Sequence, residues 1–357
     1  GCGSKSSLGR PVSGALLEVT AHRGIVDYEP TELVITARAG TPLLELEATL
    51  AESGQMLSFE PPHLGESATV GGTLACGLSG PRRPHTCAAR DSTLGVKMIN
   101  GRGEILQFGG QVMKNVAGYD VSRLMVGAQG TLGVLLDVSL KVLPRPACER
   151  SVFIEMSDVV AIDVMTWLTG KALPLSAACH LPATADRPGQ LCLRLSGAEA
   201  AVDACIQLIR HEQAGFPVEV LAADDERAHQ FWRDLRERRL DFFENHQMEE
   251  AHSLWRVSLP PATPVFWGKR RDKERSDELP GSCLIDWAGT QRWLKTSASV
   301  ETVQGVIKNK GGYATLMTPE AALLPPLNPA LAALHLRLKQ AFDPKGIFNP
   351  GRLYEAW

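Results

Sequence analysis

The distribution of glycine constrains the fold of this chain more than any other sequence feature. Of the 33 glycines, 21 lie in residues 1–133, whereas all seven tryptophans lie at residue 167 or later. Glycine allows left-handed backbone and close approach of another chain or a ligand, while tryptophan is typical of large buried cores. The length of 357 residues is sufficient for about two domains. The pattern therefore predicts a glycine-rich N-terminal part and a tryptophan-rich C-terminal part.

Charge and cysteine usage exclude several classes of protein. The formal net charge of −3 gives no reason to expect nucleic-acid binding. The eight cysteines form no CxxC pair, so we expect buried or idle thiols and no metal site. The sequence contains neither a signal peptide nor an apolar run of about 18 residues. A reducing, cytoplasmic setting fits best, and we expect any association with the inner membrane to be peripheral and to come through a partner.

Short elements are predicted along the first part of the chain. We expect strands over Ala15–Val19 and Leu33–Ala37, separated by a turn-rich segment over His22–Glu32. A helix is expected over Thr41–Ser53, with Thr41 as its cap and Gly54 as its stop. Three further strands are expected over Leu94–Ile99, Ile105–Phe108 and Leu132–Val142, the last burying Val134, Leu136, Val138, Leu140 and Val142 on one face.

The second part mixes strands with amphipathic helices. Prolines 144 and 146 indicate a boundary near residue 146. Beyond it we expect strands over Ser151–Glu155 and Gln190–Leu195, and helices over Glu199–Arg210 and Asp224–Arg239. The second helix is expected to turn Phe231, Trp232 and Leu235 inward. The mixed-charge run Lys269–Glu278 is typical of an exposed loop. The tryptophans are expected to lie in a core, with contact to partner subunits as the alternative.

Three glycine-rich stretches predict a binding surface made of backbone. The first is GCGSKS, whose N–H groups and hydroxyls suit an anion, although the same residues also fit an ordinary turn. The second is Glu60–Gly80, which carries almost no side chain on one surface. The third is Lys114–Asp120 followed by LMVGAQGTLGV. Because the first loop opens the chain with no strand before it, we expect an N-terminal strand to be missing.

Together with DPKGIFNPGR near the C-terminus, these stretches resemble the PCMH-type (vanillyl-alcohol-oxidase-like) FAD-binding family. The resemblance implies an α+β fold. Residues 1–146 would form a PCMH-type FAD-binding domain, with subdomains of about 1–55 and 56–146. Residues 147–334 would form an α+β cap with an antiparallel sheet, and residues 335–357 a tail that returns to the FAD domain.

Within that family, SKSSLGRP, EPPHLGESATVGG, GPRRP and GGQVMKNVAGYDVSRLMVG resemble the FAD-binding E-type subunits of bacterial glycolate oxidase. The resemblance implies a complex with a second flavoprotein subunit (D-type) and an iron–sulfur subunit (F-type). The complex would oxidise glycolate and D-lactate to the 2-oxo acid and pass the electrons onward through its partner subunits. The alternatives are a stand-alone FAD-dependent oxidoreductase of the same fold and a scaffold subunit with a vestigial flavin site.

The resemblance also implies residue roles, all of them in binding FAD. The pyrophosphate would be wrapped by Gly1, Cys2, Gly3, Ser4, Lys5 and Ser6. The ribityl chain and flavin ring would lie along Thr69, Val70, Gly71, Gly72, Thr73 and Gly77, with Asp91 and Ser92 in a neighbouring loop. The adenine side would meet Gly127, Gly130, Gly133 and Val134, and Asn349 would return to the flavin.

Two departures from the family pattern affect the chemistry. The first loop has Cys2 and no histidine, so FAD is expected to be non-covalent. The E-H-G motif of related D-2-hydroxyacid dehydrogenases is absent, and His229, His246, His252 and His335 stand in charged helical or loop contexts. Arg82, Arg83, His85 and Lys114 remain as candidates, with a solvated role for the arginines equally open. The catalytic residues thus stay unknown, and our hypothesis is that the companion subunit oxidises the hydroxy acid.

Overall fold

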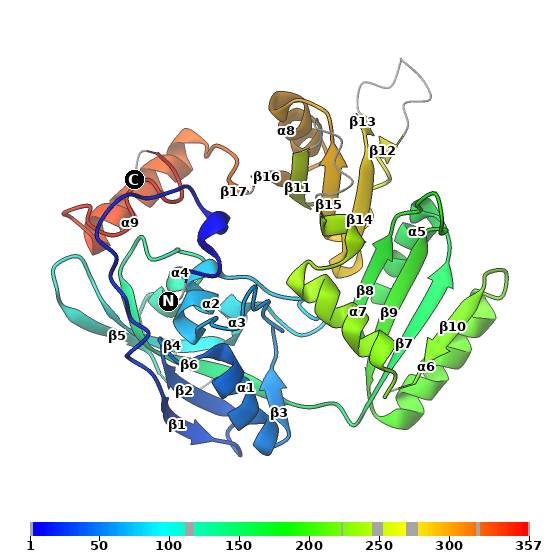
Figure 1. Ribbon diagram of the computed structural model, residues 1–357, viewed down its shortest axis with the longest axis horizontal. Coiled ribbons are helices and arrows are strands. Elements are labelled where there is room, and N and C mark those ends of the chain that lie inside the picture. Colours follow the sequence, from blue (N-terminus) through cyan, green and yellow to red (C-terminus); the bar gives the residue numbers. More distant parts are fainter. Residues whose placement is uncertain are drawn as a thin grey trace. The chain divides into compact units, whose positions relative to one another are not determined.

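The computed structural model describes residues 3–110, 118–222, 224–244, 253–268, 278–318 and 322–355. The chain forms two compact units (Figure 1). Unit 1 comprises Gly1–Gly80, Thr86–Arg145 and Pro319–Trp357, and unit 2 comprises Pro81–His85 and Pro146–Thr318. Each contains an antiparallel sheet with helices, which confirms the predicted α+β class. No helix in the described ranges is long and apolar enough to cross a membrane.

Unit 1 is organised by the long strand β6, which pairs with β2, β3 and β4 in a sheet of order β1-β2-β6-β4-β5. Strands from before and after residue 55 therefore share one sheet. The strands of this unit are β1 (Ile25–Glu29), β2 (Val34–Arg38), β3 (Gln55–Leu57), β4 (Thr93–Ile99), β5 (Ile105–Gly109), β6 (Val134–Pro144) and β17 (Ala322–Leu323). Its helices are η1 (Ser6–Leu8), α1 (Leu43–Glu52), α2 (Val70–Cys76), α3 (Ala89–Ser92), α4 (Val121–Met125) and α9 (Pro329–Phe342).

The first predicted strand, Ala15–Val19, is wrong. This segment has no regular structure, and Leu16 and Leu17 are 88% and 64% exposed. The strand that pairs with β2 is β1, which lies inside the predicted turn-rich segment. Because β1 and β6 occupy the two edges of β2, the apolar run at 15–19 finds no partner there.

Helix α1 confirms the predicted helix, but its cap differs. Leu43, Leu46 and Leu50 are fully buried at helical spacing. Pro42 is the N-cap residue, and the hydroxyl of Thr41 instead hydrogen-bonds both the amide and the carbonyl of Gly24. The threonine therefore connects the start of α1 to the β1 region rather than to the helix itself.

Helix α2 lies within the second glycine stretch, where the sequence predicted bare backbone. Thr69 caps it by accepting a hydrogen bond from the Gly72 amide at 3.2 Å, and Gly77 ends it at φ +63°. Val70 and Leu74 bury their side chains in the core of unit 1. Burial and capping thus outweigh the poor helix propensity of two adjacent glycines.

Strand β6 also departs from the predicted alternation. Its pairing with β4 shifts register between Asp137 and Leu135, so Leu136 has no partner on that strand. Such a bulge exchanges the faces of the residues before and after it. Leu135 is accordingly buried while Leu136 is only half-buried.

The sheet of unit 2 runs in the order β10-β7-β9-β8-β14-β15-β11-β16, with every neighbour antiparallel. Its strands are β7 (Cys148–Glu155), β8 (Leu175–Leu181), β9 (Gln190–Gly197), β10 (Val218–Leu221), β11 (Ser253–Ser258), β14 (Ser282–Asp286), β15 (Gln291–Thr296) and β16 (Tyr313–Met317), with a separate parallel pair β12 (Trp267–Gly268) and β13 (Leu279–Pro280). The helices are α5 (Asp158–Thr169), α6 (Glu199–Glu212), α7 (Glu226–Glu237), η2 (Asp241–Phe243), η4 (Trp287–Gly289) and α8 (Val300–Asn309).

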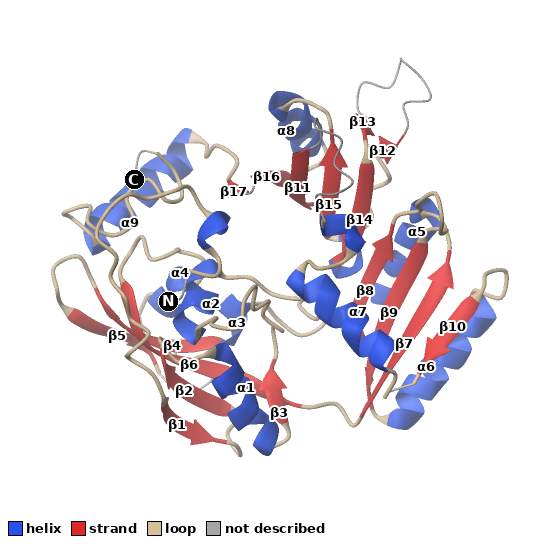
Figure 2. Cartoon of the chain, in the orientation of Figure 1, coloured by secondary structure: helices blue, strands red, loops and turns tan. Residues whose placement is uncertain are grey.

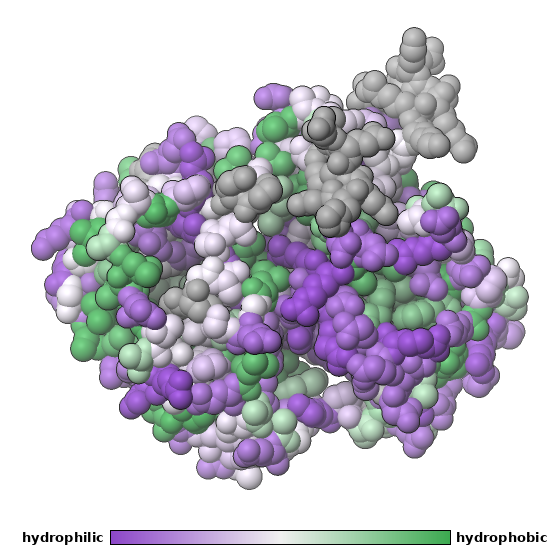
Figure 3. All heavy atoms as spheres, in the orientation of Figure 1, coloured by the Kyte–Doolittle hydropathy of each residue, from purple (hydrophilic) through white to green (hydrophobic). Residues whose placement is uncertain are grey.

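Helices cover both faces of this sheet (Figure 2). Side chains of α5, α6 and α8 share one apolar cluster with β9, whereas Trp232 and Leu235 of α7 share another with Cys179 and Cys192. The inward prediction for Trp232 and Leu235 is confirmed, and Phe231 packs there half-buried. The outer face of α7 is charged, and hydrophilic side chains gather over it in Figure 3.

The tryptophans of unit 2 confirm the core prediction. Five of them are buried, namely Trp232, Trp255, Trp267, Trp287 and Trp293. The thiols of Cys179 and Cys192 lie opposite each other on β8 and β9, fully buried, and burial holds the pKa of Cys179 well above its usual value. The predicted loop at Lys269–Glu278 lies outside the described residues except for Glu278.

Candidate functional site

A groove in unit 1 brings together four segments that are far apart in the sequence. Two cavities of about 380 and 600 Å³ share the lining residues Leu16, Gly72, Ala75, Gln129 and Asn349, and so form one continuous depression. Its walls come from the N-terminal loop, helix α2, the residues leading into β6 and the C-terminal turn. These are the segments in which the sequence analysis predicted FAD-binding residues.

The N-terminal loop forms one end of the groove. Gly3, Ser4, Lys5 and Ser6 all line it, and Gly3 has φ +77°. The Lys5 side chain is buried and donates a hydrogen bond from Nζ to the carbonyl of His63 at 2.8 Å. Lys5 thus holds the loop against the second glycine stretch. Gly1 and Cys2 lie outside the described residues.

Helix α2 lies along the middle of the groove. Thr69 and Gly72 line the groove together with Gly71. Val70 and Thr73 are fully buried, and the Thr73 hydroxyl has no hydrogen-bond partner among the described residues. A Cβ atom at Gly71 would lie 2.6 Å from Cβ of Ala39, so glycine is needed for the helix to pack this closely.

The chain leading into β6 forms the opposite wall. Gly130, Gly133 and Val134 line the groove, with φ +71° at Gly130. Gly127 does not line it. Its backbone lies beside Gly77, where an added Cβ would come within 3.1 Å of the Gly127 Cα.

The C-terminal turn completes the groove. Asn349 has φ +42°, and its Nδ2 donates a hydrogen bond to the Gln129 carbonyl at 2.7 Å. Arg352 donates from Nη2 to the Ser6 carbonyl at 2.6 Å and from Nη1 to the Arg10 carbonyl at 2.9 Å. The turn is therefore tied both to the wall at 129 and to the N-terminal loop.

Like Gly77 and Gly127, the predicted residues Asp91 and Ser92 lie elsewhere in unit 1. Asp91 accepts a hydrogen bond from the Ala88 amide at 3.1 Å, at the start of α3. Ser92 is buried, with its hydroxyl 2.6 Å from the Ser58 hydroxyl. Neither is among the described residues that line the groove. Sequence reasoning missed Gln129, Leu16 and Arg352 as lining residues, although Gln129 and Arg352 both stand in motifs that it had singled out.

Three of the four candidates for substrate chemistry, Arg82, Arg83 and His85, lie in unit 2. Arg82 is buried and forms an ion pair with Glu149 at 2.8 Å. Arg83 stacks on Trp287 with its guanidinium carbon 4.3 Å from the ring centroid. Burial, with the charges of Arg194 and Arg82, lowers the pKa of His85 to about 4. Lys114, His246 and His252 lie outside the described residues, and His229 lies on the charged helix α7.

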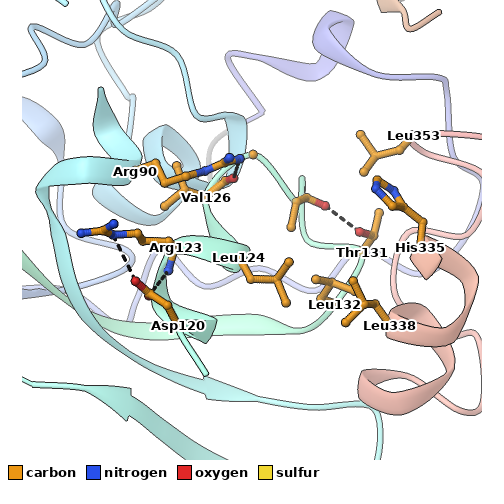
Figure 4. A pocket seen from close by; sticks show the side chains of 12 residues that line it. Arg90, Asp120, Arg123, Leu124, Val126, Thr131, Leu132, His335, Leu338 and Leu353 are labelled. Atoms are coloured by element: carbon orange, nitrogen blue, oxygen red, sulfur yellow. Dashed lines mark hydrogen bonds and ion pairs between the residues drawn. The ribbon is translucent and has the colours of Figure 1, made fainter. Parts of the chain in front are cut away.

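A separate cavity of about 410 Å³ lies beside the groove wall (Figure 4). Along residues 124–135, some residues line this cavity and their neighbours line the groove. This segment therefore separates the two spaces. Its apolar lining is supplied by leucines 124, 132, 338 and 353. Gly127 and the α9 residue His335 also line it. Its charged side chains are engaged, since Arg123 pairs with Asp120 at 3.1 Å and Arg90 donates to the Val126 carbonyl at 3.2 Å.

The groove has the properties that FAD requires. The two cavities are continuous, and the glycines that line them project no side chains into the groove. A Cβ atom at Gly130 would lie 2.9 Å from Nδ2 of Asn349, and one at Gly72 would lie 3.1 Å from Oγ1 of Thr69. Apolar side chains such as Leu16 and Phe348 are available for the rings, and the serine-rich loop is available for the pyrophosphate. The residues present therefore fit this cofactor.

Comparison with family models agrees with this assignment. A model described as "FAD binding domain" matches residues 1–109, and one described as "FAD linked oxidases, C-terminal domain" matches residues 319–353. Among solved structures, p-cresol methylhydroxylase matches with a TM-score of 0.65 at 13% identity, covering 94% of this chain and 79% of that one. Alkyldihydroxyacetonephosphate synthase matches with a TM-score of 0.63 at 17% identity, covering 93% and 66%. These likenesses confirm the PCMH-type fold.

Comparison with curated proteins narrows the family further. The chain is 24% identical over 380 residues to D-2-hydroxyglutarate dehydrogenase of Xanthomonas citri pv. viticola, covering 92% of this chain and 77% of the relative. It is 46% identical over 354 residues to glycolate oxidase subunit GlcE of Escherichia coli (strain K12), covering 99% of this chain and 91% of the relative. The predicted resemblance is confirmed, and the chain belongs to the GlcE family of FAD-linked oxidase subunits of glycolate oxidase.

Proposed function

We propose that this chain holds FAD non-covalently in the groove of unit 1 and works in a complex with a D-type flavoprotein subunit and an F-type iron–sulfur subunit. Unit 1 would be the FAD-binding domain and unit 2 the cap. The observation that carries the proposal is the groove itself, in which four motif segments meet although they span residues 3–352. The buried thiol pair Cys179–Cys192 supports a reducing, cytoplasmic setting.

The residues would divide the work of binding. The Gly3–Ser6 loop would face the pyrophosphate, and Arg352 would hold that loop by its carbonyl groups. Gly72 and Gly130 would leave room for the ribityl chain and the rings. When bound, FAD supplies the capacity to accept and release electrons. The described residues that line the groove include no histidine, which supports a cofactor that is held without a covalent bond.

We further propose that the companion subunit oxidises the hydroxy acid, glycolate or D-lactate, and that this chain takes part in passing the electrons onward. The ion pair of Arg82 and the low pKa of His85 support this division of work between the subunits. Arg82 is paired with Glu149, and His85 has a pKa of about 4, which makes it a weak base at neutral pH.

The test is to purify the isolated chain and the co-expressed complex in parallel. The isolated chain should bind FAD and show no glycolate-dependent dye reduction, whereas the complex should turn over and carry flavin on this chain as well as on the D-type subunit. Robust turnover by the isolated chain would instead identify a stand-alone oxidoreductase. A colourless chain that takes up no FAD would identify a scaffold subunit.

A further inference from the structure

Helix α9 buries a lysine while several of its leucines stay exposed. Lys339 is 4% exposed, whereas Leu331, Leu334 and Leu336 of the same helix are 44%, 44% and 39% exposed. Lysine is rarely buried to this extent unless its ammonium group is fully paired. The position of Lys339 therefore has to be explained by what its Nζ atom contacts.

The ammonium group has three acceptors. It donates to Oδ2 of Asp343 at 2.6 Å, to the carbonyl of Thr131 at 2.8 Å and to the carbonyl of Phe348 at 2.6 Å. An ammonium group has three donors, so these bonds use its full capacity. They join three segments, namely helix α9, the turn after it and the chain that leads into β6.

Asp343 completes the arrangement. Its side chain is fully buried and accepts hydrogen bonds from the amides of Phe348 at 2.8 Å and Ile347 at 3.1 Å. Burial by itself would raise the pKa of this carboxyl group, but the bonds from Lys339 and the two amides outweigh it and keep the pKa below its usual value. The segment is also closely packed, because a Cβ atom at Gly101 would lie 2.4 Å from Oδ1 of Asp343.

Both carbonyl groups that Lys339 binds adjoin the groove. Thr131 follows Gln129 and Gly130, and Phe348 precedes Asn349. Nδ2 of Asn349 donates to the Gln129 carbonyl at 2.7 Å, which is where the two walls meet. Lys339 is not among the described residues that line the groove. It therefore affects this junction through its bonds to the two carbonyl groups and not by contact with a ligand in the groove.

We infer that Lys339 is a positioning residue for the flavin site. With Asp343 as counter-ion, it sets the distance between the Gln129–Gly130 wall and the Asn349 turn. The inference rests on the proposed binding of FAD in this groove. An apolar side chain at this position would leave the Asp343 carboxylate buried without its counter-ion, which is destabilising. It also could not hold two carbonyl groups from separate segments.

The test measures FAD affinity and thermal stability side by side. Lys339→Met should raise the dissociation constant of FAD about tenfold, as expected for the loss of charge-assisted hydrogen bonds, and should alter the visible circular dichroism of the bound flavin. Leu50→Ala is the matched control, because Leu50 is fully buried in α1 and does not line the groove. It should lower the melting temperature and leave the dissociation constant within about twofold.

Asp343→Asn keeps the test decisive if Lys339→Met does not fold. It removes the counter-ion and retains the carbonyl acceptors, so FAD affinity should fall by a smaller factor in the same direction. The inference would be overturned if Lys339→Met bound FAD as tightly as Leu50→Ala does. If only Asp343→Asn folds, the same comparison is made between Asp343→Asn and Leu50→Ala. Failure of the unmodified chain to bind FAD would refute the proposed function instead, so the two failures are distinguishable.

Discussion

Gly130→Ala tests whether the groove wall must be free of side chains. Gly130 has φ +71°, a conformation that costs an L-residue about 1–2 kcal/mol. The added Cβ atom would also lie 2.9 Å from Nδ2 of Asn349. That amide is the free end of a side chain, so we expect it to rotate away and to lose its bond to the Gln129 carbonyl. The lost hydrogen bond adds about 1 kcal/mol.

Gly103→Ala is the matched control. Gly103 lies in the turn between β4 and β5 with φ +81°, and an added Cβ atom would meet nothing within 4 Å. It carries the same backbone cost without the collision. In urea unfolding of the apo chain, Gly103→Ala should lose about 1–2 kcal/mol and Gly130→Ala about 1 kcal/mol more.

The decisive comparison is FAD affinity, measured by quenching of flavin fluorescence on titration with apo protein. Displacing the Asn349 side chain should raise the dissociation constant of Gly130→Ala about fivefold, which corresponds to about 1 kcal/mol. Gly103→Ala should bind FAD like the unmodified chain. If the two variants bind FAD equally well, the junction between Gln129 and Asn349 is not part of the FAD site.

Three further predictions concern other parts of the chain. Thr69→Val removes the cap of α2 and should lower the free energy of unfolding by about 1 kcal/mol in a urea titration, because the Gly72 amide loses its acceptor. The pKa of His85 is lowered to about 4, first by burial and then by Arg194 and Arg82. The unfolded chain therefore takes up this proton below about pH 6.5 while the folded chain does not. Stability should be complete above that pH and fall towards pH 4, and His85→Asn should flatten this slope in urea titrations at pH 7 and 4.5. Acid precipitation of the yellow protein should release all flavin into the supernatant, and flavin retained in the pellet would contradict non-covalent binding.

The sequence determined the fold family and most of the groove because its signals are local. Glycine-rich turns and hydroxyl-bearing loops predict bare backbone wherever they occur. The fold family itself followed from the resemblance of these motifs, taken in order, to the PCMH-type family. Helices α6 and α7 were also predicted from local sequence, because their apolar residues repeat at helical spacing. Val202 and Trp232 belong to these repeats and are buried in the structure. Where the pattern failed, as at Ala15–Val19, a competing strand took the sheet edge.

Only the tertiary structure decided which side chains hold the groove together. Gln129 meets Asn349 across 220 positions, and Lys339 reaches Thr131 across 208. No local pattern marks such residues, because their roles exist only once distant segments are packed side by side. A buried lysine in an apolar helix looks like a solvated charge in the sequence. It becomes a link between two walls only when folding removes water and leaves three oxygen atoms as its partners.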